Sequence, residues 1–292
     1  MHMTGNANSV YGRKVLDAAQ GNQLIKQSLM GDKPVLAGRI GTVETQMLNV
    51  YYENPDLANA EKADPCIEKL VTNAGFFPGR HGEVLNFCKL YDTLIPQMDI
   101  FASILIQQED FYVHRHLAGC SVVALNALEP YYFPDDPWSA SLAGKKVLIV
   151  SPFSDSIENQ YRKRDRIFPG SDILPVFQLE TVKAVQTIGS NTGGFDSWFE
   201  ALECMKQEIS KKDFDIAIIG CGAYSLPLGC FIKDMKRKCV IMGGATQILF
   251  GIKGKRWDHH KTISLLYNDA WVRPAANEIP KDFQNVENGC YW

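Results

Sequence analysis

The chain has 292 residues, of which 46% are hydrophobic and 22% charged, a composition typical of globular proteins. Its net charge of −3 at pH 7 gives no overall field that would attract nucleic acid or an anionic membrane surface. The length suffices for a full hydrophobic core, and no apolar run reaches the roughly 18 residues of a membrane-spanning helix.

Other broad features also favour a cytoplasmic protein. The N-terminal residues 1–11 are polar and lack the apolar core of a secretory signal. The eight cysteines form no C-x-x-C pair, and several lie in apolar runs, which favours buried free thiols over disulfides or zinc ligands. The histidines at 114, 116, 259 and 260 lack zinc-site spacing, so we interpret them as surface or structural residues.

The first half of the chain mixes helical spacing with short apolar runs. Apolar residues at helical spacing predict helices over residues 15–30, 44–52, 66–73, 84–98 and 120–128. Compact apolar runs predict strands over residues 35–37, 101–106 and 111–116. The adjacent Phe76 and Phe77 are interpreted as a buried plug, with stacking on a ligand as the alternative.

The strand at 35–37 leads into the corner Gly38-Arg39-Ile40-Gly41-Thr42-Val43-Glu44. Its two glycines allow a tight turn, and Thr42 is a suitable N-cap for the next helix. Such a corner directs backbone N–H groups and an arginine toward the same solvent, which suits an anionic ligand such as a diphosphate. The alternative is that Arg39 and Glu44 only pair with each other.

The second half of the chain has a clearer rhythm, after a connection rich in Pro, Asp and aromatic residues. Strands are predicted over 145–150, 173–179, 215–219 and 239–242, and they alternate with helices from Ser154 or Asp155, over 197–211, 226–236 and 247–251. This alternation predicts one α/β domain over 1–292, Rossmann-like, with a mostly parallel sheet and helices on both faces. It would comprise an N-terminal half (11–128), a connection (129–144), a Rossmann-like half (145–257) and a tail (258–292).

Four of the predicted strands end in small or polar residues, at 38–42, 151–154, 220–225 and 243–246. In a parallel sheet these ends share one edge, where α/β proteins bind ligands. The sequence therefore predicts a cleft at this edge. The tail ends in Tyr291 and Trp292, which we expect to dock onto the domain or onto a neighbouring subunit.

Known nucleotide motifs fit this cleft poorly. Gly220-x-Gly222-x-x-Ser225 has Ser in place of the third Gly of the dinucleotide fingerprint, and the next strand ends at Gly243 instead of an acidic residue. Both departures argue against NAD or FAD. The chain also lacks a P-loop motif and a G-x-S-x-G elbow. Lys253, Lys255 and Arg256 suit phosphate oxygens, although a solvated basic loop explains them equally well.

Two segments resemble a known family. The corner Gly38–Glu44 is similar to the R-x-G-D-x-E corner of bacterial glycosyltransferases with the GT-D fold. The G-x-G-A-Y turn at 220–224 and the segment G-G-A-T-Q-x-L-F-G-x-K-G-x-R-W at 243–257 resemble GT-D-like proteins of surface polysaccharide and S-layer glycan synthesis. The resemblance covers residues 35–257. It implies transfer of a sugar from a nucleoside diphosphate donor to a glycan or lipid-linked hydroxyl.

The resemblance also implies a D-x-E motif that meets a metal ion and the diphosphate. Arg39, Gly41 and Glu44 match this motif, but Thr42 stands at the Asp position. Because Thr is neutral and a weaker ligand than a carboxylate, this departure argues against a tightly held Mn²⁺ or Mg²⁺ at Glu44. The basic residues of 253–256, with Arg39, could neutralise the leaving diphosphate instead.

These considerations give each candidate residue a role. Glu44 is the expected general base or remaining metal ligand, and Asp155, at another strand end, is the second candidate for the base. Arg39, Lys253 and Arg256 would hold phosphate. The other predicted donor-binding residues are Gly41, Thr42, Gly220, Gly222, Ala223, Tyr224, Gly243, Gly244, Thr246 and Gln247, with the Tyr224 ring available for stacking.

Two alternatives stay open. Loss of the motif Asp at position 42 would suit a degenerate nucleotide-binding or glycan-binding scaffold. A methyltransferase using S-adenosylmethionine also needs a Gly-rich strand end, but Gly243 again replaces its usual acidic residue. The expected partners are a sugar nucleotide and an acceptor, with no nucleic acid. We expect the protein in the cytoplasm, including the inner face of the membrane, as a monomer or a homo-oligomer.

Overall fold

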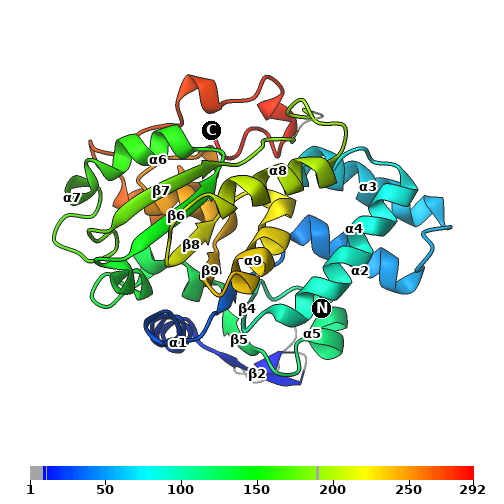
Figure 1. The fold of residues 1–292 in the computed structure, drawn as a ribbon, viewed down its shortest axis with the longest axis horizontal. Helices are drawn as coiled ribbons and strands as arrows, with labels where there is room; N and C mark the ends of the chain where they lie inside the picture. Colours follow the sequence, from blue (N-terminus) through cyan, green and yellow to red (C-terminus); the bar gives the residue numbers. More distant parts are fainter. Residues whose placement is uncertain (1–8, 11, 189–190) are drawn as a thin grey trace.

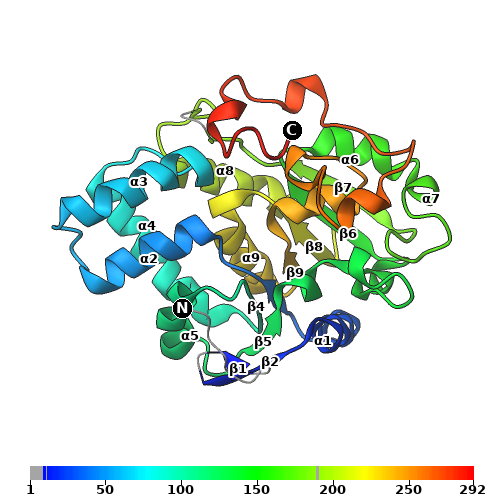
Figure 2. The same ribbon diagram turned by 180° about the vertical axis from the view of Figure 1, so that it is seen from behind.

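A computed structural model describes residues 9, 10, 12–188 and 191–292, and within these residues nine strands form one sheet. The strand order is β1-β2-β5-β4-β3-β9-β8-β6-β7. The strands from β2 to β9 are all parallel, and only the two-residue edge strand β1 (Ser9–Val10) is antiparallel. Helices cover both faces of this sheet (Figures 1 and 2). The prediction of an α/β, Rossmann-like fold is confirmed.

The first half of the chain supplies one side of the sheet. Its strands are β2 (Arg13–Leu16), β3 (Leu36–Gly38), β4 (Ile100–Ser103) and β5 (Ser121–Ala124). Its helices are α1 (Ala18–Met30), α2 (Thr42–Glu53), α3 (Ala60–Ala74), α4 (His81–Leu94) and α5 (Asp110–His116).

The second half supplies the other side. Its strands are β6 (Lys146–Ser151), β7 (Gln178–Lys183), β8 (Ile216–Ile219) and β9 (Lys238–Ile241). Its helices are α6 (Ser154–Tyr161), α7 (Arg164–Ile167), α8 (Trp198–Ser210), α9 (Ser225–Asp234) and α10 (Thr246–Leu249). Within the described part of the chain, no helix combines the length and the apolar composition needed to cross a lipid bilayer.

Several predicted elements are wrong in type or position. Residues 13–16 form strand β2, and the helix begins only at Ala18. The Asp17 side chain accepts a hydrogen bond from the Gln20 backbone N–H and so caps α1 at this position. Residues 110–116 form helix α5 instead of a strand. Residues 121–124 form strand β5, followed by a 3₁₀ turn, instead of a helix. The strand expected at 173–179 lies at Gln178–Lys183.

The strands alternate their side chains between two cores. In β6, Leu148 and Val150 belong to the core that also contains residues of α2–α5, α8 and α9, whereas Val147 and Ile149 belong to the core that contains residues of α1, α6 and α10. Strand β3 pairs with β9, so the two halves of the chain share one continuous sheet. After β3 the chain continues into α2, which belongs to the core with Leu148 and Val150. After β9 it continues into α10, which belongs to the core on the opposite face of the sheet, with Val147 and Ile149. Diverging connections of this kind open a crevice at the carboxyl edge of a parallel sheet.

Candidate functional site

A cavity of about 210 Å³ lies beyond the carboxyl ends of β3, β6, β7, β8 and β9. This volume is several times the roughly 30 Å³ that one water molecule occupies in the liquid. Most of the sequence-predicted residues line it: Arg39, Gly41, Thr42, Glu44, Gly220, Gly222, Tyr224, Gly243, Gly244 and Arg256. Arg39 and Gly222, which are far apart in the sequence, therefore open onto the same space.

The side chain of Arg39 lines this cavity. A Cβ atom placed on Gly243 would lie 2.9 Å from its Nη2, so a side chain at this position would push the guanidinium away from its present place. Gly243 also has a φ of +63°, a left-handed conformation that favours glycine. Among the described residues, no direct hydrogen bond or ion pair engages the half-buried Arg39 side chain, although its charge acts on the nearby carboxyls of Glu44 and Glu129 and opposes the rise in their pKa values. A half-buried guanidinium whose N–H groups have no direct acceptor suits the binding of an anion.

Glu44 lies beside Arg39 in the first turn of α2 and is 6% exposed. Gly41, not the predicted Thr42, is the N-cap of α2, and no side chain caps it. A Cβ on Gly41 would overlap the Glu44 carboxylate, which folds back over the helix end, so a larger residue there would have to move that carboxylate. Burial raises the pKa of the Glu44 carboxyl, although its own backbone N–H and the charge of Arg39 act in the opposite direction. A buried carboxyl with a raised pKa at a cavity wall suits a general base.

The corner after β8 forms another wall. Gly222 has a φ of +57°, and a Cβ there would lie 3.2 Å from the carbonyl oxygen of Ala74 at the end of α3. Tyr224 is 2% exposed, and its ring stacks on Trp198 at 4.9 Å, so that ring is not available to stack on a nucleobase. Ala223 is buried and does not line the cavity. At this corner the glycines Gly220 and Gly222 present backbone to the cavity, and the Tyr224 ring is packed against Trp198.

The corner after β9 meets the corner after β8. A Cβ on Gly220 would overlap the Gly243 carbonyl oxygen and lie 2.6 Å from the Thr246 hydroxyl. Thr246 and Gln247 are each 1% exposed and lie behind the cavity wall. The Gln247 side chain donates to the carbonyl oxygen of Tyr291 at 3.1 Å, so it holds the tail in place.

The following loop holds three basic residues predicted to suit phosphate, Lys253, Lys255 and Arg256, and of these only Arg256 lines the cavity. Its guanidinium lies 4.8 Å from the ring centre of Tyr291 and forms an ion pair with Glu287. Lys253 points elsewhere, with its ammonium group 5.2 Å from the centre of the Tyr267 ring. The expectation that the tail docks onto the domain is confirmed, because Tyr291 and Trp292 both line the cavity.

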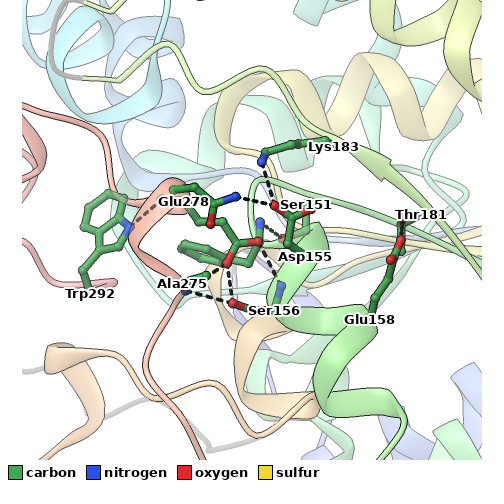
Figure 3. Close-up of polar contacts among 11 residues, drawn as sticks. Ser151, Asp155, Ser156, Glu158, Thr181, Lys183, Ala275, Glu278 and Trp292 are labelled. Atoms are coloured by element: carbon green, nitrogen blue, oxygen red, sulfur yellow. Dashed lines mark hydrogen bonds and ion pairs between the residues drawn. The ribbon is translucent and has the colours of Figure 1, made fainter.

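Asp155 belongs to a polar cluster beside α6, shown in Figure 3. Its Oδ2 accepts hydrogen bonds from Lys183 at 3.1 Å and from Asn277 at 2.7 Å. These contacts, led by the Lys183 bond, lower the pKa of Asp155, and the residue does not line the cavity. Asp155 is therefore poorly placed as a general base.

The same cluster closes the N-terminal end of α6 to a ligand. The carboxylate of Glu278, which is 2% exposed, accepts from the Ser156 amide at 3.0 Å and from the Ser156 hydroxyl (Figure 3). The indole of Trp292 donates to the Glu278 carbonyl oxygen at 3.2 Å. An acidic side chain of the protein itself thus occupies this helix end, and the tail is anchored through it.

Sequence reasoning missed one wall of the cavity. The segment 184–188 after β7 and the end of α3 at Asn73 and Ala74 both line it. Thr187 joins these two parts, since its hydroxyl donates to the Gly75 carbonyl oxygen at 2.5 Å and contacts the Tyr224 hydroxyl at 2.9 Å. Apolar spacing places no strand end at residue 184, because the preceding strand is half exposed and carries charged residues.

Cys221 also lines the cavity but is not a nucleophile at neutral pH, because burial raises the pKa of its thiol to about 12. Across residues 9–10, 12–188 and 191–292, no three His, Cys, Asp or Glu side chains gather in a group that could hold a metal ion. The residues present thus do not form a full metal-ligand set around Glu44.

No protein-family model, curated protein or solved structure matches this chain.

Proposed function

We propose that this protein is a glycosyltransferase that moves a sugar from a nucleoside diphosphate donor to a hydroxyl of a glycan or lipid-linked acceptor. The observation that carries the proposal is the unpaired Arg39 guanidinium, which lies over Gly243 in a cavity shared by several strand ends. The resemblance of the Arg39–Glu44 corner and of the segment 243–257 to GT-D glycosyltransferases supports the same assignment.

A diphosphate suits this position for two reasons. Arg39 offers several N–H donors in a planar fork, which matches phosphate oxygens, and its partial burial strengthens the interaction. Gly220, Gly222, Gly243 and Gly244 carry no side chains, so phosphate oxygens can approach the backbone at these corners. The positive end of the α2 dipole also points to this space, although Glu44 offsets part of it.

Glu44 would accept the proton of the acceptor hydroxyl. In the net reaction the acceptor oxygen bonds to the anomeric carbon of the sugar, and the bond from that carbon to the diphosphate breaks. The diphosphate leaves with the bonding electron pair, and the hydroxyl proton passes to the Glu44 carboxylate. Arg39 and Arg256 would stabilise the negative charge that develops on the leaving diphosphate.

The test combines binding and turnover. Binding of UDP, GDP, dTDP and S-adenosylmethionine is measured by thermal shift, and sugar release or transfer is measured with the corresponding sugar nucleotides. We expect one nucleoside diphosphate to stabilise the protein and Arg39→Gln to abolish that stabilisation. We also expect Glu44→Gln to keep donor binding but to lose transfer by 100-fold or more, as for other general bases.

Glu208→Gln is the matched control, because it removes a surface carboxylate of α8 that pairs with Lys211. This variant should keep full activity. Saturable nucleotide binding without hydrolysis or transfer, across a broad acceptor panel, would replace the proposal with a binding scaffold. Stabilisation by S-adenosylmethionine alone would replace it with a methyltransferase.

A further inference from the structure

A second arginine, Arg256, faces the cavity, but its guanidinium is already paired with a carboxylate of the protein itself, that of Glu287. Arg256 and Glu287 both line the cavity, and their side chains are 37% and 44% exposed. Arg256 Nη2 forms an ion pair with Glu287 Oε2, while Nη1 donates to the Tyr291 hydroxyl at 3.3 Å. Arg256 is thus the cationic side chain of the cavity that meets a carboxylate of the tail.

The two arginines lie at the same wall of the cavity, beside the consecutive residues Gly243 and Gly244. Arg39 lies over Gly243, and Tyr291 packs on Gly244, where a Cβ would overlap Cε1 of the ring. The Arg256 guanidinium in turn lies on that ring. A ligand with two anionic groups therefore finds one arginine unpaired and the other engaged by Glu287.

We infer that Glu287 occupies the position of a second anionic group, and that a diphosphate ligand displaces it from Arg256. This inference rests on the proposed function, because it takes a diphosphate as the occupant of the cavity. Arg39 would then hold one phosphate and Arg256 the other. Glu287 is thus an internal competitor for Arg256. It lowers the affinity of the protein for a diphosphate more than the affinity for a ligand that reaches only one arginine.

The backbone around Glu287 is consistent with easy displacement. Glu287, Asn288 and Gly289 have φ values of +48°, +58° and +71°, so two non-glycine residues in succession adopt the left-handed conformation. Asn and Gly adopt this conformation readily but Glu does not, so the strain in the turn that brings Glu287 to Arg256 lies at Glu287 itself. The ion pair itself is partly exposed, and such pairs contribute little to stability. A doubly charged phosphate forms a stronger, two-pronged contact with arginine.

The experiment is a double-mutant cycle with inorganic pyrophosphate and inorganic phosphate as probes, measured by isothermal titration calorimetry. We expect Glu287→Gln to tighten pyrophosphate binding about 2- to 5-fold, the range that an exposed ion pair supplies. We expect a smaller effect on inorganic phosphate, which Arg39 alone can hold. In the Arg256→Gln background, Glu287→Gln should have no effect, because the competition no longer exists.

Glu208→Gln controls for the general loss of one negative charge and should leave both affinities unchanged. An unchanged or weaker affinity of Glu287→Gln for pyrophosphate would overturn the inference while leaving the proposed function intact. The same gain in the Arg256→Gln background would also overturn it, because the effect would then be long-range. Absence of pyrophosphate binding in every variant would overturn both proposals, whereas binding without any sugar transfer would overturn only the proposed function.

Discussion

Substitution of Gly243 by alanine tests the position of Arg39 most sharply. Gly243 has a φ of +63°, and a Cβ there would lie 2.9 Å from Arg39 Nη2 and 3.3 Å from Nε. The left-handed conformation costs a residue with a Cβ about 1–2 kcal/mol. The new methyl group also displaces the guanidinium. Since a hydrogen bond to a charged group contributes about 1.5–3 kcal/mol, displacement should weaken pyrophosphate binding about 10- to 100-fold.

Gly170 provides the matched control. Its φ is +73°, and nothing lies within 4 Å of a Cβ placed on it. Gly170→Ala should therefore lose the same 1–2 kcal/mol of stability, measured by chemical denaturation, but bind pyrophosphate like the wild type. The reasoning is refuted if Gly243→Ala loses the stability of the control and yet binds pyrophosphate with unchanged affinity.

Three further predictions concern stability. Glu44→Gln should be more stable than the wild type at pH 8. The pKa of the Glu44 carboxyl is raised in the folded state. Its contribution to the free energy of unfolding is therefore fully present below the unfolded-state pKa of about 4.3 and is lost as pH rises through the folded-state pKa. Thermal unfolding between pH 4 and 8 tests this, and an advantage that does not grow with pH would contradict it. Trp198→Ala should lose about 3–5 kcal/mol, because Trp198 is fully buried against several rings, among them Phe76 and Tyr224; a loss below 1 kcal/mol in urea denaturation would count against that packing. Trp292→Ala should lose about half as much, since this side chain is only partly buried, and an unchanged melting temperature would mean that its packing adds nothing to stability.

The elements that the sequence predicted well are those with an unambiguous pattern. The buried runs at 215–219 and 239–242 correspond to β8 and β9, and the run at 35–37 corresponds to β3. Glycine corners after these strands predicted a shared edge, because all three strands are parallel neighbours. Phe76 and Phe77 are 0% and 7% exposed, so their interpretation as a buried plug is confirmed.

The elements predicted wrongly are short, and their apolar residues fit both periods. In α5, Tyr112 and Val113 are buried and Phe111 is exposed, a pattern that seven residues cannot assign to helix or strand. In β5, the run at 121–124 continues directly into a 3₁₀ turn whose Ala127 and Leu128 are also buried, which extends the apolar pattern to helical length. Only pairing with β2 and β4 decides that β5 is a strand.

The sequence predicted the site residues that directly follow a strand. It did not predict the parts of the cavity wall that only tertiary contacts bring into place. Arg39, Glu44 and the glycines follow strands β3, β8 and β9, so the parallel sheet brings them together. Glu287 reaches the cavity only because the tail crosses the carboxyl edge of the sheet, where the red segment lies at the top of Figures 1 and 2. No local pattern in the sequence encodes that return.

The central claim is that the cavity at the carboxyl edge binds the diphosphate of a sugar nucleotide through Arg39. The most direct measurement is a crystal structure of the protein with the nucleoside diphosphate that gives the largest thermal shift. The account predicts density for a phosphate within hydrogen-bond distance of the Arg39 guanidinium, next to Gly243. Density for the diphosphate elsewhere on the molecule, with the Arg39 side chain left without a ligand, would contradict it.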